Sequence, residues 1–174
     1  GGQFGGLYAL DQKTGCVHWR FDADAAIRGA ISVVRSGRGG AVVFFADFLT
    51  NVYALDASDG HVIWRTQVGR QKDSVVTGSV AVHDGRVYIP LSSMEVAAAI
   101  DPDYECCQGS GAVVALDALN GQEVWYHRTL QDQARPVGKT LHGSRLLPPS
   151  GAPLRSTPTL PAKRNKPYAR TGEP

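Results

Sequence analysis

Short runs of apolar, β-prone residues separated by polar turns recur along the chain. In three places a run, a turn and a second run follow one another, over residues 6–19, 51–64 and 112–125. Short β-prone runs that are bounded by turn residues are typical of β-strands. The pattern therefore predicts three β-hairpins.

The three hairpins share the unit Ala-Leu-Asp-x-x-x-Gly-x-x-x-Trp. The Asp opens the turn because its carboxylate accepts nearby backbone N–H groups, and the Gly supplies the positive φ that the turn requires. Each unit ends on a tryptophan, at Trp19, Trp64 or Trp125. A large ring in the same register in every copy suits packing between neighbouring repeats, so we expect all three to be structural.

Further β-prone runs complete a larger repeat. Residues 29–34 correspond to 78–82, and residues 41–46 correspond to 86–91. Each full unit then holds four short strands at a spacing of roughly 45 residues, which is typical of propeller blades. The sequence therefore predicts an all-β fold, a β-propeller of four-stranded antiparallel blades. About three blades cannot close a ring without exposed edges, so we expect a fragment of a larger propeller.

The expected boundaries follow from this repeat. They are a half blade at 1–28, a blade at 29–69, a blade at 70–130, a long loop at 131–154 and a half blade at 155–174. The second blade is longer than the first because it carries an insertion at 92–111. Long loops on a repeat scaffold commonly carry function, so the insertion and the 131–154 loop are the expected functional segments.

Composition narrows the classes of function. The chain has 174 residues and a net charge of +2, which does not favour a surface for nucleic acid. No apolar run is long enough for a membrane span. The three cysteines are too few for a disulfide-dense scaffold, and no CxxC, CxxCH or HExxH motif offers a site for zinc or c-type haem. Without an initiator Met or a signal-peptide pattern, the chain is expected to begin inside a longer protein.

The repeat unit resembles that of the pyrroloquinoline quinone (PQQ) dependent dehydrogenases, which are eight-bladed propellers. Within that family the polyvinyl-alcohol dehydrogenase group is most similar. The segments that carry this resemblance are Leu-Ser-Ser-Met-Glu at 91–95, Asp-Pro-Asp-Tyr-Glu-Cys-Cys at 101–107 and Ser-Gly-Ala-Pro-Leu at 150–154. The resemblance covers essentially the whole chain. It implies about three blades of an eight-bladed ring.

The resemblance also implies a set of cofactor contacts. Arg28 and Thr77 take the places of an arginine and a threonine that contact PQQ. The stretch that holds PQQ in the family corresponds here to Ser92, Ser93 and Met94. Arg155 stands where the family has a tryptophan under the quinone ring, and a guanidinium can also stack on a flat ring.

The implied metal is Ca²⁺, with Glu95 and Glu173 as side-chain ligands, since carboxylate oxygens suit a hard cation. The catalytic Asp of the family lies in later blades, so no catalytic residue is expected in this chain. Arg28, Thr77 and the two glutamates are expected to converge near one end of the propeller axis. The competing interpretation is that Glu95 is a solvated loop carboxylate and Arg28 a surface or blade-edge residue. In that interpretation Thr77 and Ser92 satisfy backbone groups at strand ends.

For Cys106 and Cys107, a disulfide between neighbours competes with two free loop thiols. The periplasmic setting of the family favours the disulfide.

Two functions remain open. In the first, the chain is a fragment, inactive alone, of a PQQ- and Ca²⁺-dependent alcohol dehydrogenase that oxidises polyvinyl alcohol or related secondary alcohols. Its partners are the remaining blades and a cytochrome c that accepts the electrons, its location is the periplasm, and haem c is expected only elsewhere in the full-length protein. In the second, the chain belongs to a non-catalytic propeller, a scaffold or outer-membrane assembly factor. The Ser-Ser-Met-Glu and Glu-Cys-Cys stretches favour the enzyme, and Arg155 favours the cofactor-free propeller.

Overall fold

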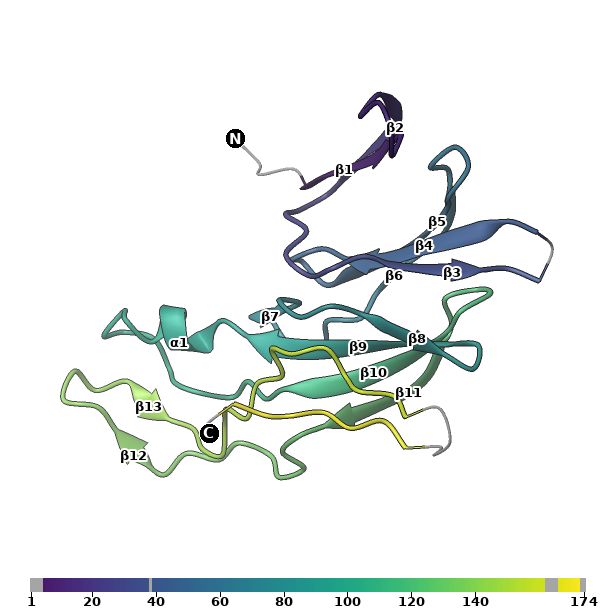
Figure 1. The fold of residues 1–174 in the computed structure, drawn as a ribbon. Coiled ribbons are helices and arrows are strands. Elements are labelled where there is room, and N and C mark those ends of the chain that lie inside the picture. The colour runs from purple at the N-terminus through teal and green to yellow at the C-terminus, as the bar shows by residue number, and fades with distance from the viewer. Residues whose placement is uncertain (1–4, 38, 162–165, 173–174) are drawn as a thin grey trace.

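The computed structural model describes residues 5–37, 39–161 and 166–172, and most of its regular structure is antiparallel β-sheet (Figure 1). The chain starts with a two-stranded sheet of β1 (Gly5–Leu10) and β2 (Val17–Ala23). The first four-stranded sheet follows, in the order β3-β4-β5-β6. Its strands are β3 (Ser32–Arg35), β4 (Ala41–Ala46), β5 (Asn51–Asp56) and β6 (Val62–Gln67). Strands that are neighbours in sequence are neighbours in this sheet, as in a propeller blade.

The second sheet repeats this order and adds a strand. Its four blade strands are β8 (Ala81–His83), β9 (Arg86–Ser93), β10 (Ala112–Asp117) and β11 (Glu123–Arg128). The additional strand β7 (Ser74–Val75) pairs with the far end of β9, beyond the part that pairs with β8. The predicted all-β propeller architecture of four-stranded antiparallel blades is confirmed.

The two long connections depart from the plain blade. The insertion contains a short helix, α1 (Glu95–Ala98), which the sequence pattern did not predict. The 131–154 loop contains a small hairpin of β12 (Gly138–Lys139) and β13 (Arg145–Leu146). In Figure 1 the helix and this hairpin extend from the same end of the second blade. After them the chain forms only isolated bridges, Leu154 with Thr171 and Thr159 with Tyr168.

The repeated turn has the predicted conformation. The glycines at its centre, Gly15, Gly60 and Gly121, have φ angles of 72°, 77° and 71°. In the first copy the Asp11 carboxylate accepts the backbone N–H groups of Lys13 and Thr14, at 3.1 and 2.8 Å. Each turn is therefore stabilised as expected, by an aspartate at its start and by a residue without a Cβ where φ is positive.

Two of these glycines, Gly60 and Gly121, also contact the tryptophan of the preceding repeat. The indole N–H of Trp19 donates to the Ala57 carbonyl at 3.0 Å, and that of Trp64 donates to the Ala118 carbonyl at 3.0 Å. A Cβ added at Gly60 would lie 2.6 Å from the Trp19 ring, and one at Gly121 would lie 2.6 Å from the Trp64 ring. The glycine is thus required for close packing between repeats as well as for its φ angle.

The core lies between the sheets. One cluster of buried hydrophobic residues joins β4–β6 to the inner strands of the second blade and includes Trp64 and Phe44. A second cluster joins the first hairpin to β4 and β5 around Phe45 and Tyr53. The backbones of the two blades also approach each other closely where each repeat begins. A Cβ added at Gly29 would lie only 2.4 Å from the carbonyl oxygen of Gly78. Within the described residues no helix has the length and apolar character that crossing a membrane would require.

Candidate functional site

The insertion folds back over the carboxylate of Glu95, the first residue of α1. Glu95 is only 7% exposed. The backbone N–H of Gln108 donates to Oε1 at 2.8 Å, and the N–H of Gly109 donates to Oε2. The N–H of Glu95 itself donates to the Ser93 hydroxyl at 3.2 Å. A buried carboxylate that accepts two backbone N–H groups has partners for both of its oxygens. These hydrogen bonds within the insertion also fix its position.

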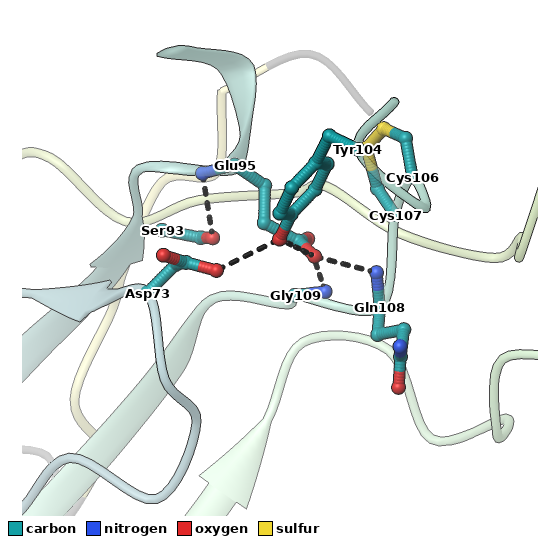
Figure 2. The surroundings of a disulfide bond; sticks show 8 residues. All are labelled: Asp73, Ser93, Glu95, Tyr104, Cys106, Cys107, Gln108 and Gly109. Carbon is teal, nitrogen blue, oxygen red and sulfur yellow. Dashed lines mark hydrogen bonds between the residues drawn. A yellow bond between two sulfur atoms is a disulfide. The ribbon is translucent and has the colours of Figure 1, made fainter. Parts of the chain in front are cut away.

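The hydroxyl of Tyr104 adds a single proton that two carboxylates share. Figure 2 shows its hydroxyl between two carboxylates, 2.8 Å from Oδ2 of Asp73 and 3.1 Å from Oε1 of Glu95. Burial raises the pKa of the Tyr104 hydroxyl above its usual value, and the hydrogen bond to Asp73 and the charge of Glu95 raise it further. The hydroxyl therefore keeps its proton at neutral pH, and it links the segment before β7 to the start of α1.

The turn at Gln108 and Gly109, which supplies the two N–H donors, is stabilised by contacts of its neighbours in the chain. Cys106 and Cys107 are joined by a disulfide directly before Gln108. The carbonyl of Cys106 accepts the N–H of Leu147 at 2.6 Å. Arg145 makes two hydrogen bonds to Glu105, at 2.8 and 2.7 Å, and they hold the pKa of that carboxyl below its usual range. The 131–154 loop thus supports the insertion.

Two cavities meet at Glu95. One has a volume of about 460 Å³, and its lining includes Ser93, Glu95, Cys107 and Arg155. The other has a volume of about 630 Å³ and shares Ser93 and Glu95 with the first, while Tyr104 belongs to its wall. One acid, one guanidinium and two serine hydroxyls therefore line the smaller cavity, which is a polar site with both signs of charge.

The residues predicted from sequence fall into two groups. Ser93, Glu95 and Arg155 are brought together in the smaller cavity. Arg28 lies elsewhere, with its guanidinium 4.5 Å from the centre of the Phe48 ring, and it lines neither cavity. Met94 is 39% exposed and lines neither cavity.

Two further predicted residues lie at or near the pairing of β7 with β9, with Ser92 buried and Thr77 partly buried. Ser92 pairs with Val75, and Thr77 follows two positions later. Neither the Ser92 Oγ nor the Thr77 Oγ1 has a hydrogen-bond partner among the described residues, although both atoms are buried. Glu173 lies outside the described residues.

These observations fit part of the implied cofactor set. Buried hydroxyls without partners cost free energy, so a polar partner would stabilise those of Ser92 and Thr77, although neither residue lines either cavity. Arg155 offers a planar cation to a carboxylate or a flat ring. For Ca²⁺ the fit is partial, because no group of three or more His, Cys, Asp or Glu side chains in the described part of the chain is placed to hold a metal ion. Glu95 fits as one ligand, and six to eight oxygens are usual for Ca²⁺.

Sequence reasoning missed the support around Glu95. Tyr104 stands within a stretch that carries the family resemblance, but its contact with Glu95 depends on how the insertion folds back. Asp73 is distant in sequence and has no motif around it. The donors of Gln108 and Gly109 are backbone groups, which any residue type supplies. Only the adjacent cysteines, two residues before Gly109, marked this turn in the sequence.

Comparison with known proteins agrees with the fold and the repeat. Polyvinylalcohol dehydrogenase of a Pseudomonas species is 39% identical over 170 residues, which cover 96% of this chain and 27% of the relative. The enzyme of the same name from a Sphingopyxis species is 38% identical over 170 residues, with 96% and 26% covered. The chain therefore spans about a quarter of the length of these curated relatives.

Solved structures show the same architecture at low sequence identity. The quinohemoprotein alcohol dehydrogenase ADHIIG of Pseudomonas putida superposes with a TM-score of 0.70 at 19% identity, over 98% of this chain and 26% of its own. The quinohemoprotein alcohol dehydrogenase of Comamonas testosteroni superposes with a TM-score of 0.65 at 21% identity, over 96% and 26%. A family model, PQQ_2, described as outer membrane protein assembly factor BamB, matches residues 1–138. That match spans the three hairpins and both four-stranded blades, and it places the chain in the PQQ_2 family of repeat propellers.

Proposed function

We propose that this chain is part of a PQQ- and Ca²⁺-dependent alcohol dehydrogenase that oxidises polyvinyl alcohol or a related secondary alcohol. The names of its relatives support the substrate class and the quinone cofactor. A relative named 1-butanol dehydrogenase (cytochrome c) supports a cytochrome c as the electron acceptor. The periplasm is the proposed location, following the family. The observation that carries the proposal is the cavity that both Glu95 and Arg155 line. The buried hydroxyls of Ser92 and Thr77, which lack partners among the described residues, support it from outside that lining.

In this function each residue has a definite role. Bound PQQ would supply a quinone that accepts a hydride, and with it two electrons, from the alcohol. Ser92 and Thr77 would donate their unpaired hydroxyls to it, and Arg155 would lie against it. Arg28 would add positive charge at the quinone oxygens by resemblance, provided that its side chain leaves the Phe48 ring.

Glu95 would contribute one oxygen ligand to Ca²⁺, with Glu173 as a second ligand. The proton of the alcohol would be taken by an Asp outside this chain.

The family description favours a second candidate, a non-catalytic propeller that acts as a scaffold or outer-membrane assembly factor. The presence of Arg155 in the same cavity as Glu95 also favours it, because a guanidinium supplies positive charge where a bound cation would otherwise do so. The two candidates differ in whether the cavity takes a cofactor.

Reconstitution of the protein that carries this chain tests the choice. After incubation with PQQ and Ca²⁺ and removal of free cofactor, the enzyme proposal expects a bound-quinone absorbance and dye-linked oxidation of a secondary alcohol. Arg155→Trp restores the aromatic residue of the family and is expected to retain or strengthen PQQ binding. Glu95→Gln is expected to abolish the dependence on Ca²⁺. If no quinone is retained by the protein or by its Arg155→Trp variant, the scaffold reading stands.

A further inference from the structure

The larger of the two cavities lies beside the one that Glu95 and Arg155 line. The two share Ser93, Glu95 and Gly109 as lining residues, so they border one another along the start of α1 and the end of the insertion. The larger cavity has a volume of about 630 Å³, which is within the usual range for a ligand site. The proposed reaction leaves this cavity without a role.

The charges that line the larger cavity balance. Its lining contains three basic and three acidic side chains, namely Arg70, Lys72, Arg128, Asp73, Glu95 and Glu105. An anion in the cavity would meet the carboxylates, and a cation would meet the basic groups. Placing like charges next to each other costs free energy, so neither kind of ion is favoured. The lining therefore suits a ligand that is polar and uncharged.

Several groups of this lining have hydrogen-bonding capacity to spare. Oδ2 of Asp73 accepts the Tyr104 hydroxyl, whereas Oδ1 has no donor among the described residues and points away from Tyr104 in Figure 2. Nε of Arg128 donates to the Ser110 hydroxyl at 3.2 Å, which leaves the two terminal nitrogens without a partner in the described part of the chain. The exposed ammonium of Lys72 makes no hydrogen bond or ion pair with a described residue. An alcohol hydroxyl both donates and accepts, so it can use acceptors and donors of this kind together.

We propose that the larger cavity is a binding subsite for a neutral polyhydroxy chain, and that it holds hydroxyl groups of the substrate next to the one that reacts. The inference rests on the proposed function, because it concerns which alcohols that enzyme prefers. Arg128 and Lys72 donate to the chain hydroxyls, and Asp73 accepts from them. A simple secondary alcohol is too short to fill both cavities, so the subsite selects a polymer over a single alcohol unit.

Binding of short poly(vinyl alcohol) to the protein that carries this chain, without PQQ or Ca²⁺, is the first test and is measured by calorimetry. Lys72→Met and Arg128→Met each remove donors, and each is expected to weaken binding by roughly twofold to tenfold. Lys72 has no partner to lose, so its substitution should leave folding intact. Lys139→Met is the matched control, because Lys139 is exposed in β12 and lies outside this lining.

Unchanged affinity in Lys72→Met and Arg128→Met, or equal weakening in Lys139→Met, would overturn the subsite. Polyacrylate of similar length carries carboxylates in place of hydroxyls, and it is expected to bind more weakly than poly(vinyl alcohol). Tighter binding of polyacrylate would overturn the assignment of a neutral ligand.

Steady-state kinetics of the protein loaded with PQQ and Ca²⁺ is the second test. Lys72→Met is expected to raise KM for poly(vinyl alcohol) severalfold more than KM for isopropanol. If both values change alike while oxidation continues, the proposed function stands and the subsite fails. If the protein retains no quinone and oxidises no alcohol, but binds poly(vinyl alcohol) through Lys72 and Arg128, the proposed function fails and the binding site stands.

Discussion

Substitution of the repeat glycines by alanine separates two physical costs. Gly15 and Gly121 have nearly equal φ angles, 72° and 71°. A Cβ at Gly15 would meet nothing within 4 Å, whereas one at Gly121 would lie 2.6 Å from the ring of Trp64. Trp64 is 8% exposed and is tied by its indole N–H to the second blade, so it has little room to withdraw.

The expected magnitudes differ accordingly. Within the 174-residue chain, where no described residue packs on Gly15, Gly15→Ala should cost only the left-handed conformation, roughly 1–2 kcal/mol. Gly121→Ala should cost the same strain plus overpacking of typically about 1–3 kcal/mol, a total of roughly 2–5 kcal/mol. Native-state amide exchange across the hairpins β1–β2 and β10–β11 measures the local free energy of opening for each variant. Equal losses in the two variants, within about 0.5 kcal/mol, would refute the claim that this glycine is required for packing between blades.

Three further outcomes are expected. Tyr53→Phe removes a hydroxyl that donates at 2.9 Å to the fully buried Asp47, and loss of a hydrogen bond to a charged group should cost about 1.5–3 kcal/mol, seen as a lower melting temperature. Arg145 holds the pKa of Glu105 below its ordinary value of 4.5, so their link should be complete above that pH and should be lost as the pH falls through the lowered folded-state pKa. Amide exchange in the 131–154 loop should therefore accelerate on acidification, and Glu105→Gln should remove this dependence. Reducing the disulfide of the insertion should speed exchange of the two amides that follow it, and an unchanged rate would show that the disulfide does not restrain them.

The blades were predictable because their information is local and repeated. The Asp and Gly of each turn act within a few residues, and the recurrence of Trp19 and Trp64 at one register identified the surface between blades. The second requirement on Gly60, its contact with a tryptophan far along the chain, could not be read from a turn motif. The same glycine meets both requirements. Its role in the turn explains its presence, so the sequence gives no separate sign of its contact with the tryptophan.

The site was less predictable because its geometry depends on long-range contacts. Glu95 and Arg155 were singled out by resemblance, and their meeting in one cavity required the 131–154 loop to return to the blade. The link from Asp73 through Tyr104 to Glu95 joins residues with no common motif. Arg28 was expected to converge with Thr77 and Glu95, whereas its guanidinium stacks over Phe48 outside both cavities.

Each hairpin shifts register at the same point, between Ala9 and Leu10, Ala54 and Leu55, and Ala115 and Leu116. Such a one-residue irregularity bends a strand and increases its twist. The bend of each outer hairpin therefore lies beside its turn, and in the second blade this is the opposite end of β10 from the insertion. The β9–β10 connection could consequently be lengthened, and a ligand-holding turn built there, without changing the register of the hairpin.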